Sequence, residues 1–399
     1  MLKNALKRPI VLCLFCCLVL FGIVACSAGN TGGVGSMPTA TSATTKPIAT
    51  TTPTTKPTIQ LTSIRMLNEN NGWAFTRQSI LLTTDGGLHW RDVSPANLSG
   101  IVGNQGVRAG AFFNASMAWV SLNTKDSTIQ ILRTSDSGQH WDTTTLQGSG
   151  FPDRVHFVNA QDGWIEIDRG GAAGSEAVDI YQTTNGGQTW NKVSDTGPTP
   201  GSLPFNGHKT GISFKDTTTG WATGDIARPD FVWLYATHDG GKTWQHQDLA
   251  LPPGIANPTM MTTTPPVFFG NTGFLPVLIA ANGRLEVLYV THDGGTTWKS
   301  TTPLHIAPGS IFSLTSSVYV FDVNQSWTWP DQWNTSYSTG DGGQHWTTYT
   351  SSIQNGISGM SFISRTTGWA IGNSSTNEPL LFKTTDGGQT WSKVDYSIE

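Results

Sequence analysis

The sequence predicts an all-β fold made of a repeated four-stranded unit, and three observations support this prediction. Only 13% of the 399 residues are charged, whereas glycine occurs 45 times and tryptophan 16 times. This composition favours short strands joined by tight turns over helices rich in Ala, Glu and Lys. The third observation is an octapeptide that recurs seven times at intervals of 45 to 54 residues. A helical bundle and a coiled coil are therefore excluded.

The octapeptide has the form Thr-x-Asp-x-Gly-x-(Thr/His)-Trp. Its third position is acidic in six copies and an amide in one: Asp85, Asp136, Asn185, Asp239, Asp293, Asp341 and Asp386. Glycine supplies the positive φ of a tight hairpin, and we expect the third side chain to accept backbone N–H bonds across it. We predict a structural motif between the third and fourth strands of each repeat. Side chains spaced around a rim do not converge on one substrate, so a catalytic or calcium-binding array is not expected.

A second element, usually Gly-Trp, precedes each octapeptide, as in Gly72-Trp73-Ala74 and Gly368-Trp369-Ala370. A short alternating apolar stretch comes before it, as in Ile212-Ser213-Phe214. Each period thus supplies four antiparallel strands, which is the content of one propeller blade. Seven periods predict a seven-bladed β-propeller over residues 59–399, with no room for a second domain.

The N-terminus predicts export. Basic residues precede an apolar run from Ile10 to Val24, which at about 15 residues is shorter than the roughly 20 that span a bilayer. The run ends in Ile23-Val24-Ala25-Cys26, which resembles the lipobox of bacterial lipoproteins and implies lipidation of Cys26. An uncleaved anchor is the alternative. Both place the chain outside the cytoplasm, attached to the cell membrane, and residues 27–58, rich in Thr and Pro, predict a disordered linker.

Composition also limits the chemistry. A net charge of −4 argues against a nucleic-acid binder, which needs a basic face. All four cysteines lie in the first 26 residues and the histidines lack compact ligand spacing, so we predict no metal and no cofactor. Glu166 and Asp168 have a spacing that permits an acid/base pair. A solvated strand end is the preferred interpretation, and no catalytic residue is predicted.

The octapeptides and the Gly-Trp elements account for thirteen tryptophans, and Trp233 reads as a packed strand residue. Trp329 and Trp333 remain, in a segment that also holds Asp331. We predict that these three residues bind a partner protein or a glycan, the alternative being a loop folded over its own blade. Four long segments predict loops on the face opposite the octapeptides, which would carry the partner surface: Asp168–Glu176, Asp195–Lys209, Leu249–Pro266 and Thr301–Ser310.

The pattern resembles the Asp-box, or BNR, repeat of sialidases, xyloglucan-cleaving hydrolases, sortilin-type receptors and photosystem II assembly factor propellers. Seven copies of the form TTDGGQTW with Gly-Trp-Ala, after a signal peptide, are most similar to the last family. The resemblance covers residues 59–399 and implies a non-enzymatic scaffold for an extracytoplasmic or membrane protein partner. The arginine-rich binding patch of that family is not carried over, because the ten arginines beyond residue 26 are dispersed.

The alternative function is a carbohydrate-binding or sialidase-type glycoside-hydrolase propeller at the cell surface. The Phe/Tyr-Arg-Ile-Pro signature that the resemblance to sialidases would imply does not occur. The resemblance to the xyloglucan hydrolases implies a cleft between two propellers, and this chain has the length of one.

Overall fold

The computed structural model describes residues 60–228, 231–306, 318–329, 335–353, 356–373 and 379–399. These residues belong to the second of two compact units, Pro57–Glu399. The first unit, Met1–Lys56, lies outside the described residues, and so do the predicted signal peptide and linker. Within the described ranges, no helix combines the length and the apolar character needed to cross a bilayer.

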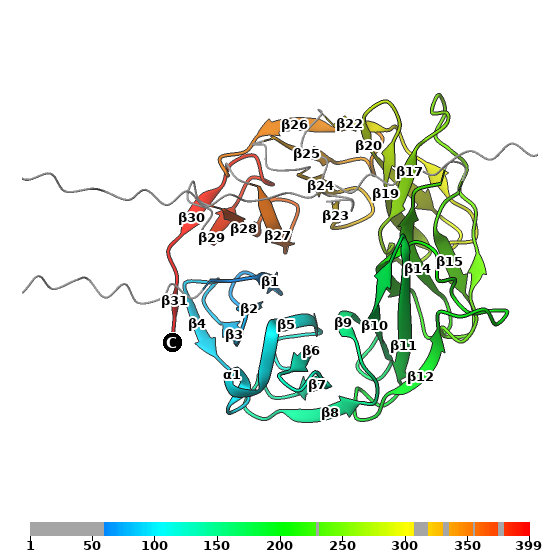
Figure 1. Cartoon of the computed structure of the whole chain (residues 1–399). Helices are drawn as coiled ribbons and strands as arrows, with labels where there is room; N and C mark the ends of the chain where they lie inside the picture. The colour runs from blue at the N-terminus through cyan, green and yellow to red at the C-terminus, as the bar shows by residue number, and fades with distance from the viewer. Residues whose placement is uncertain (1–59, 229–230, 307–317, 330–334, 354–355, 374–378) are drawn as a thin grey trace, which may run out of the picture. The chain divides into compact units, whose positions relative to one another are not determined.

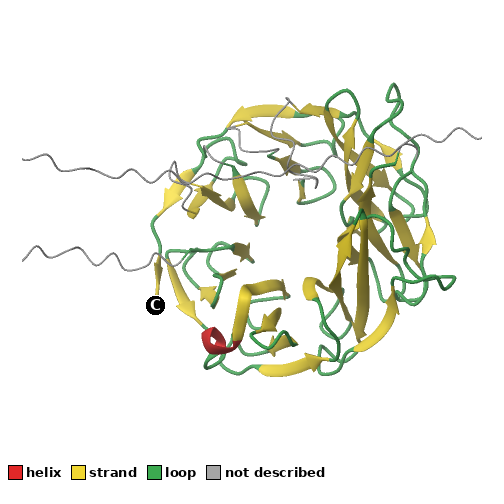
Figure 2. Cartoon of the chain, in the orientation of Figure 1, coloured by secondary structure: helices red, strands yellow, loops and turns green. Residues whose placement is uncertain are grey.

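Strands make up most of the described chain, and Figure 2 shows one short helix among them, α1 (Leu98–Ile101). We number seven repeats by their octapeptides. Repeats 1 to 3 contain β1 (Ser63–Met66), β2 (Gly72–Phe75), β3 (Ile80–Thr83), β4 (His89–Asp92), β5 (Val102–Phe112), β6 (Ala118–Thr124), β7 (Ile129–Thr134), β8 (Asp142–Leu146), β9 (Phe151–Phe157), β10 (Gly163–Ala172), β11 (Ser175–Thr183) and β12 (Asn191–Asp195).

The remaining repeats have the same order of strands. Repeats 4 and 5 contain β13 (His208–Phe214), β14 (Gly220–Ile226), β15 (Leu234–Thr237), β16 (Gln245–His246), β18 (Val267–Phe269), β19 (Thr272–Ala280), β20 (Arg284–Thr291) and β21 (Lys299–Ser300). Repeats 6 and 7 contain β23 (Tyr319–Val320), β24 (Ser326–Thr328), β25 (Thr335–Thr339), β26 (Thr347–Thr350), β27 (Ile357–Phe362), β28 (Gly368–Asn373), β29 (Pro379–Thr384) and β30 (Ser392–Val394). Three strands lie between or after repeats: β17 (Met260–Thr263), β22 (Leu304–Ile306) and β31 (Ser397–Ile398).

Repeats 2, 3, 6 and 7 each form a separate four-stranded antiparallel sheet, whereas repeats 4 and 5 share a ten-stranded sheet. The shared sheet exists because β14 and β19 extend beyond their own repeats, and β17 pairs with both extensions. Thr262 of β17 lies opposite Asp225 on one side and Leu278 on the other. The extensions would otherwise expose unpaired backbone groups. The predicted loop Leu249–Pro266 therefore contains a strand, and four strands per repeat does not describe this sheet.

The first and last repeats of this unit are neighbours. The C-terminal strand β31 pairs in parallel with β4, and the Ser397 N–H donates to the Leu88 carbonyl at 3.0 Å. On the inner side, the Met66 N–H donates to Ser361 Oγ at 2.8 Å. Figure 1 shows the sheets following one another around a common centre, with β1, β5, β9, β23 and β27 nearest to it.

The apolar core is divided into clusters that lie between consecutive repeats. One cluster joins Trp119 of repeat 2 to Val155 and Ile165 of repeat 3. Another joins Trp369 of repeat 7 to Ile64 of repeat 1. Each sheet is thus apolar on both faces, and its burial depends on its two neighbours.

The tryptophan of the second strand links each of four repeats to the next. Its indole N–H donates to the carbonyl of the first glycine in the following octapeptide: Trp119 to Gly186 at 2.7 Å, Trp164 to Gly240 at 2.9 Å, Trp327 to Gly387 at 2.7 Å and Trp369 to Gly86 at 2.9 Å. The last of these bonds joins repeat 7 to repeat 1. In three cases the ring also stacks on a phenylalanine of the next repeat, with centroids 3.7 to 3.8 Å apart.

The glycine before the tryptophan makes room for that phenylalanine. Gly163 lies opposite Phe157 on the neighbouring strand, and a Cβ at Gly163 would stand 2.5 Å from the Phe157 ring. The ring therefore lies over the glycine and reaches Trp119 of the preceding repeat. The same relation holds for Gly220 with Phe214, where the distance would be 2.4 Å. The Gly-Trp pair is explained by packing between sheets.

A substitution at Trp369 tests the link between repeats 7 and 1. Trp369→Phe keeps a ring in the core but removes the N–H that binds Gly86, so the free energy of unfolding should fall by about 1–2 kcal/mol. Trp369→Ala also leaves a cavity and should lower it by about 3–5 kcal/mol. Urea unfolding followed by tryptophan fluorescence measures both. The exposed Leu88→Ser is the control, and equal stability of Trp369→Phe and wild type would show that the hydrogen bond contributes nothing.

Candidate functional site

The seven octapeptides fold into hairpins with the same hydrogen bonds. The Thr83 hydroxyl donates to Asp85 Oδ1 at 2.9 Å and accepts the Gly87 N–H at 3.0 Å. Asp85 Oδ1 also accepts the His89 N–H at 3.0 Å. These three bonds recur in every octapeptide. In the third copy Asn185 Oδ1 accepts the same bonds. The predicted turn bonds are present in the structure.

The octapeptides mark one face of the Pro57–Glu399 unit. The N–H of the fourth octapeptide residue donates to a carbonyl in the turn between the first and second strands, as in Gly86 to Asn70 and Gly387 to Thr366, both at 2.8 Å. We call this side the octapeptide face. Because the strands are antiparallel, the second-to-third turns and the connections between repeats lie on the opposite side, which we call the connector face.

The octapeptide carboxylates are occupied as hydrogen-bond acceptors. The backbone N–H and the ring of His140 bind Asp136 and lower its pKa to about 2. His345 acts in the same way on Asp341, whose pKa is also about 2. These side chains are ionised at neutral pH and bound within their own turns. Among the described residues, no three His, Cys, Asp or Glu side chains are placed to hold a metal ion.

Trp329 is the one member of the predicted aromatic site that the structure describes, since Asp331 and Trp333 lie outside the described residues. Its indole N–H donates to the Ile357 carbonyl of repeat 7 at 2.7 Å. Its ring packs, half-buried, against the cluster that contains Trp327 and Phe362. This environment is that of a packed side chain, and binding by the three residues stays a prediction.

The prediction of a solvated strand end at Glu166 and Asp168 is wrong for Glu166, which is 1% exposed. It shares a strand face with Trp164, whose indole reaches repeat 4, so its carboxyl is enclosed between sheets. Burial raises the pKa of Glu166 to about 8. Asp168 instead accepts the Gly170 N–H at 2.6 Å. The two carboxyls therefore do not form an accessible acid/base pair.

Lys209 fixes the long connection between repeats 3 and 4. Its ammonium donates to the carbonyls of Glu176, Phe205, Asn206 and Gly207 at 2.8 to 3.3 Å. Burial lowers the pKa of Lys209 to about 8. The predicted loop Asp195–Lys209 is thus tied to its neighbours by hydrogen bonds. These bonds fix the backbone of the connector face at this point.

The segment Asp168–Glu176, predicted as a loop, is a hairpin instead. β10 continues to Ala172 and pairs there with Ser175 of β11. The strands lengthen because their backbone groups find partners in each other beyond a bulge after Asp168.

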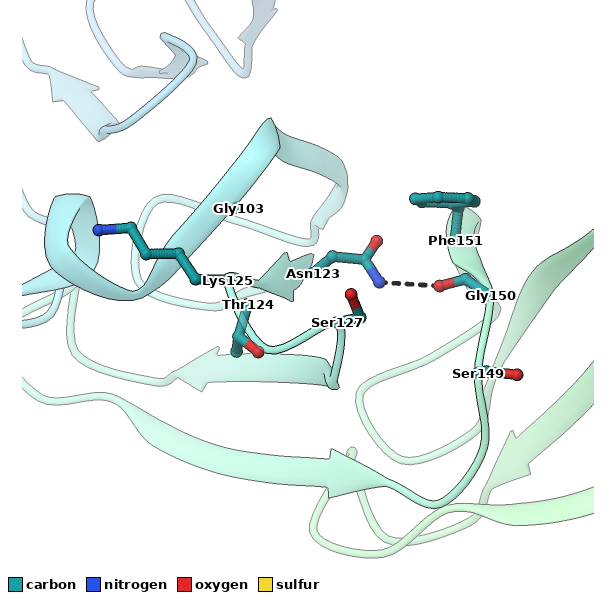
Figure 3. Close-up of a pocket in the computed structure, with 8 residues that line it drawn as sticks. All are labelled: Gly103, Asn123, Thr124, Lys125, Ser127, Ser149, Gly150 and Phe151. Carbon is teal, nitrogen blue, oxygen red and sulfur yellow. Dashed lines mark hydrogen bonds between the residues drawn. The ribbon is translucent and has the colours of Figure 1, made fainter.

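A pocket of about 370 Å³ opens on the connector face between repeats 2 and 3. Figure 3 shows the Asn123 amide in its centre, with the Phe151 ring to one side and Ser127 among the other residues of the lining. Asn123 is 4% exposed, and its Nδ2 donates to the Gly150 carbonyl at 2.7 Å. Asn123 Oδ1 is buried without a hydrogen-bond partner among the described residues. A buried acceptor in this state is unusual and marks the pocket as a candidate site.

Exposed apolar side chains lie beside this pocket and along the same face. Ile101 and Phe151 begin repeats 2 and 3, and Phe205 lies in the connection before repeat 4. Their exposed fractions are 38%, 41% and 46%. The Ile101 carbonyl accepts the N–H of Lys125, a lining residue of the pocket. Three exposed apolar side chains therefore lie on the connector face, and two of them, Ile101 and Phe151, lie at this pocket.

Sequence reasoning missed Asn123 and Phe151, because neither belongs to a repeated motif. The available signal was Phe151 itself, an aromatic residue directly after Ser-Gly in a connection that the repeat pattern leaves without a role. The burial of Asn123 depends on Gly150 of the next repeat, which no local pattern reveals.

Comparison with known proteins agrees with these hairpins. Residues 382–393 match the BNR/Asp-box repeat. The chain is also similar to the structure of YCF48 bound to D1 peptide, with a TM-score of 0.53, 15% identity, and coverage of 82% of this chain and 94% of that one. YCF48 from Cyanidioschyzon merolae gives a TM-score of 0.52 and 16% identity over 83% and 97% of the two chains. The fold is therefore an Asp-box β-propeller similar to YCF48.

A xyloglucanase of family GH74 from Xanthomonas campestris gives a TM-score of 0.35 and 14% identity, over 81% of this chain and 62% of that one. This likeness is too small to bear on function. No curated protein sequence matches the chain significantly.

Substitution of Asp386 separates hydrogen bonding from charge in an Asp-box. Asp386→Asn keeps the oxygen that accepts from Thr390 and Thr384, as Asn185 does, and should change the free energy of unfolding by less than about 0.5 kcal/mol at pH 7. Asp386→Ala should lower it by about 1–2 kcal/mol. Urea unfolding measures both. Equal losses in the two variants would show that the charge is required.

The same variants give a pH dependence. Burial acts to raise the pKa of Asp386, but hydrogen bonds from Thr390 and Thr384 outweigh it, and the pKa is lowered. A carboxylate with a lowered folded pKa stabilises fully above its unfolded pKa, near 4, and loses this contribution as the pH falls through the folded value. The difference between wild type and Asp386→Ala should therefore shrink below pH 4.

Glu166→Gln should stabilise the protein at alkaline pH. The folded pKa of Glu166 is raised to about 8 from 4.5, so the folded state holds a proton that the unfolded state releases between these values. Wild-type stability falls as the pH rises through this window. Glutamine removes this dependence, and the variant should gain about 1–3 kcal/mol at pH 8 and little at pH 5. Exposed Glu69→Gln is the control for urea unfolding at both pH values, and equal slopes for wild type and Glu166→Gln would contradict the assignment.

Proposed function

We propose that this chain is a non-enzymatic scaffold that binds a protein partner through its connector face. The observation that carries the proposal is the pocket at Asn123, bordered by exposed Ile101 and Phe151, on the face that the Asp-boxes leave free. Exposed apolar side chains next to a pocket are typical of protein interaction sites. The similarity to YCF48, which has been solved bound to D1 peptide, supports a peptide-binding propeller of the same kind.

The proposal includes seven blades, one for each repeat, with the ten-stranded sheet holding two of them joined by β17. Seven equivalent Asp-box hairpins support this number. It also includes attachment to the outer side of the cell membrane through a lipid on Cys26. The sequence Ile23-Val24-Ala25-Cys26 and the linker 27–58 support this attachment.

The absence of catalysis is part of the proposal. Six Asp-box carboxylates are bound in their turns, and Glu166 is buried between sheets. The accessible pocket at Asn123 is lined by no carboxylate, whereas glycoside hydrolysis generally needs two.

The full chain should retain the same protein partners from detergent-solubilised membranes in repeated pull-downs. Ile101→Ser combined with Phe205→Ser removes apolar surface from the connector face and should lower partner recovery at least about tenfold. Leu88→Ser combined with Phe113→Ser removes side chains that are at least as exposed from the octapeptide face and should leave recovery unchanged. Quantitative mass spectrometry measures recovery.

Loss of partners in the octapeptide-face control alone would overturn the assigned face. Hydrolysis of xyloglucan or a sialoside by the purified chain would overturn the scaffold. Cys26→Ser, which removes the proposed lipid acceptor, should release the chain from the membrane fraction.

A further inference from the structure

The pocket between repeats 2 and 3 has a polar centre, Asn123 Oδ1, that no described residue satisfies with a hydrogen bond. The Asn123 amide is oriented by its bond to the Gly150 carbonyl, drawn as the dashed line in Figure 3. This bond places the nitrogen on Gly150 and leaves Oδ1 as the free acceptor. Leaving such an acceptor buried and unpaired destabilises a protein, so a donor from a ligand is favoured there.

The partner of Asn123 is held rigidly. Gly150 has a φ of +136°, and a Cβ at this position would stand 2.4 Å from the Asp168 carbonyl. The residue must therefore be glycine, and it lies directly before the first residue of β9. The amide of Asn123 consequently cannot turn to bury Oδ1 against the backbone without losing its bond.

Equivalent positions in the next two repeats provide an internal comparison. Asn123, Asp168 and Asp225 each lie four residues after the tryptophan of the second strand. Asp168 Oδ1 accepts the Gly170 N–H at 2.6 Å, and Asp225 Oδ1 contacts His208 Nδ1 at 3.3 Å. Within the described part of the chain, a polar oxygen at this position is therefore hydrogen-bonded in repeats 3 and 4, whereas Asn123 Oδ1 in repeat 2 has no partner.

The rest of the lining combines apolar surface and one cation. Phe151 is 41% exposed at one side of the pocket, and Lys125 extends from the other side in Figure 3. Lys125 forms no ion pair within the described residues, and the lining contains no acidic side chain. The charged side chain in the lining is therefore positive and complements a carboxylate.

We propose that this pocket binds an extended peptide segment of the partner protein. A backbone N–H of the segment donates to Asn123 Oδ1, an apolar side chain packs on Phe151, and an acidic side chain or terminal carboxylate lies near Lys125. The proposal rests on the proposed function and assigns it a site. A volume of about 370 Å³ fits a few residues and excludes a folded domain.

A peptide fits these residues better than a sugar does. The exposed apolar residues are Phe151 and Ile101, which complement apolar side chains. A sugar exposes several hydroxyl groups that each donate and accept, and the pocket offers no carboxylate to accept from them. Along an extended peptide, backbone N–H groups alternate with side chains. One N–H can therefore donate to Asn123 Oδ1 while a neighbouring side chain packs on Phe151.

The test selects random linear peptides displayed on phage against the full chain in detergent, followed by fluorescence anisotropy with the selected peptides. We expect sequences that place an apolar residue near Asp or Glu. Asn123→Leu removes the acceptor at similar volume, and Phe151→Ser removes the apolar wall, so each should raise the dissociation constant about tenfold or more. Ser127→Ala is a milder change in the same pocket and should weaken binding less. Phe113→Ser, which removes an equally large exposed ring from the octapeptide face, is the matched control and should bind as wild type.

Lys125→Gln should weaken binding and reduce its dependence on salt. Thermal unfolding of each variant separates loss of binding from loss of fold, and Ser127→Ala and Lys125→Gln test the pocket if Asn123→Leu is unstable. Peptides whose affinity is the same in Asn123→Leu, Phe151→Ser and wild type would overturn the proposal. A glycan on an array that binds wild type and not Asn123→Leu would also overturn it.

The pull-down distinguishes this inference from the proposed function. If membrane partners are lost on Ile101→Ser with Phe205→Ser but retained by Asn123→Leu and Phe151→Ser, the scaffold function stands and the pocket assignment fails. If no partner is recovered by wild type under any condition, the proposed function fails first.

Discussion

The indole of the second-strand tryptophan is the contact on which the arrangement of the sheets depends. In repeats 2, 3, 6 and 7 it reaches across to the following octapeptide and donates to a glycine carbonyl. In repeat 4 the same link passes through a side chain, since Trp221 donates to Gln247, whose amide donates to Gly295. A strand alone gives no fixed distance to the next sheet. The tryptophan fixes the distance and the angle between neighbouring sheets, because its hydrogen bond and its ring contact act together.

This contact explains why the octapeptide needs its shape. The Thr and Asp side chains close the hairpin so that the glycine carbonyl points outward to the indole of the preceding repeat. The glycines adopt positive φ values, 77° at Gly86 and 92° at Gly87, that other residues rarely adopt. The bonds themselves do not require a charge, because Asn185 Oδ1 makes them in the third hairpin.

The sequence predicted the structure correctly where the interacting residues lie within a few positions of each other. The hairpin bonds of Asp85 and the third strands at Ile80 and Leu380 follow from local rules. The stacking of Phe157 on Trp119 did not follow from the sequence, because the two residues belong to different repeats. Only the packing of one sheet on the next brings their rings together. The prediction for Glu166 was wrong for the same reason. The alternation of side chains along a strand assigns Glu166 to one face, but whether that face is exposed to solvent or packed against repeat 4 depends on the tertiary structure. Strand β17 and the pocket at Asn123 arise in connections that differ between repeats.

The Pro57–Glu399 unit thus has one face on which the same local structure recurs in every repeat and another face on which the repeats differ. Every hairpin of the octapeptide face has the same hydrogen bonds, so a partner that bound this face would contact nearly the same surface in each repeat. The connector face has no such repetition. Four residues after the tryptophan, the polar oxygen has no partner among the described residues at Asn123, accepts from its own turn at Asp168, and contacts His208 at Asp225. Specific recognition requires a surface that occurs once. Repeats 2 to 4 have such a surface. The links between their sheets hold the residues of this surface in fixed positions, so these residues do not have to stabilise the fold themselves.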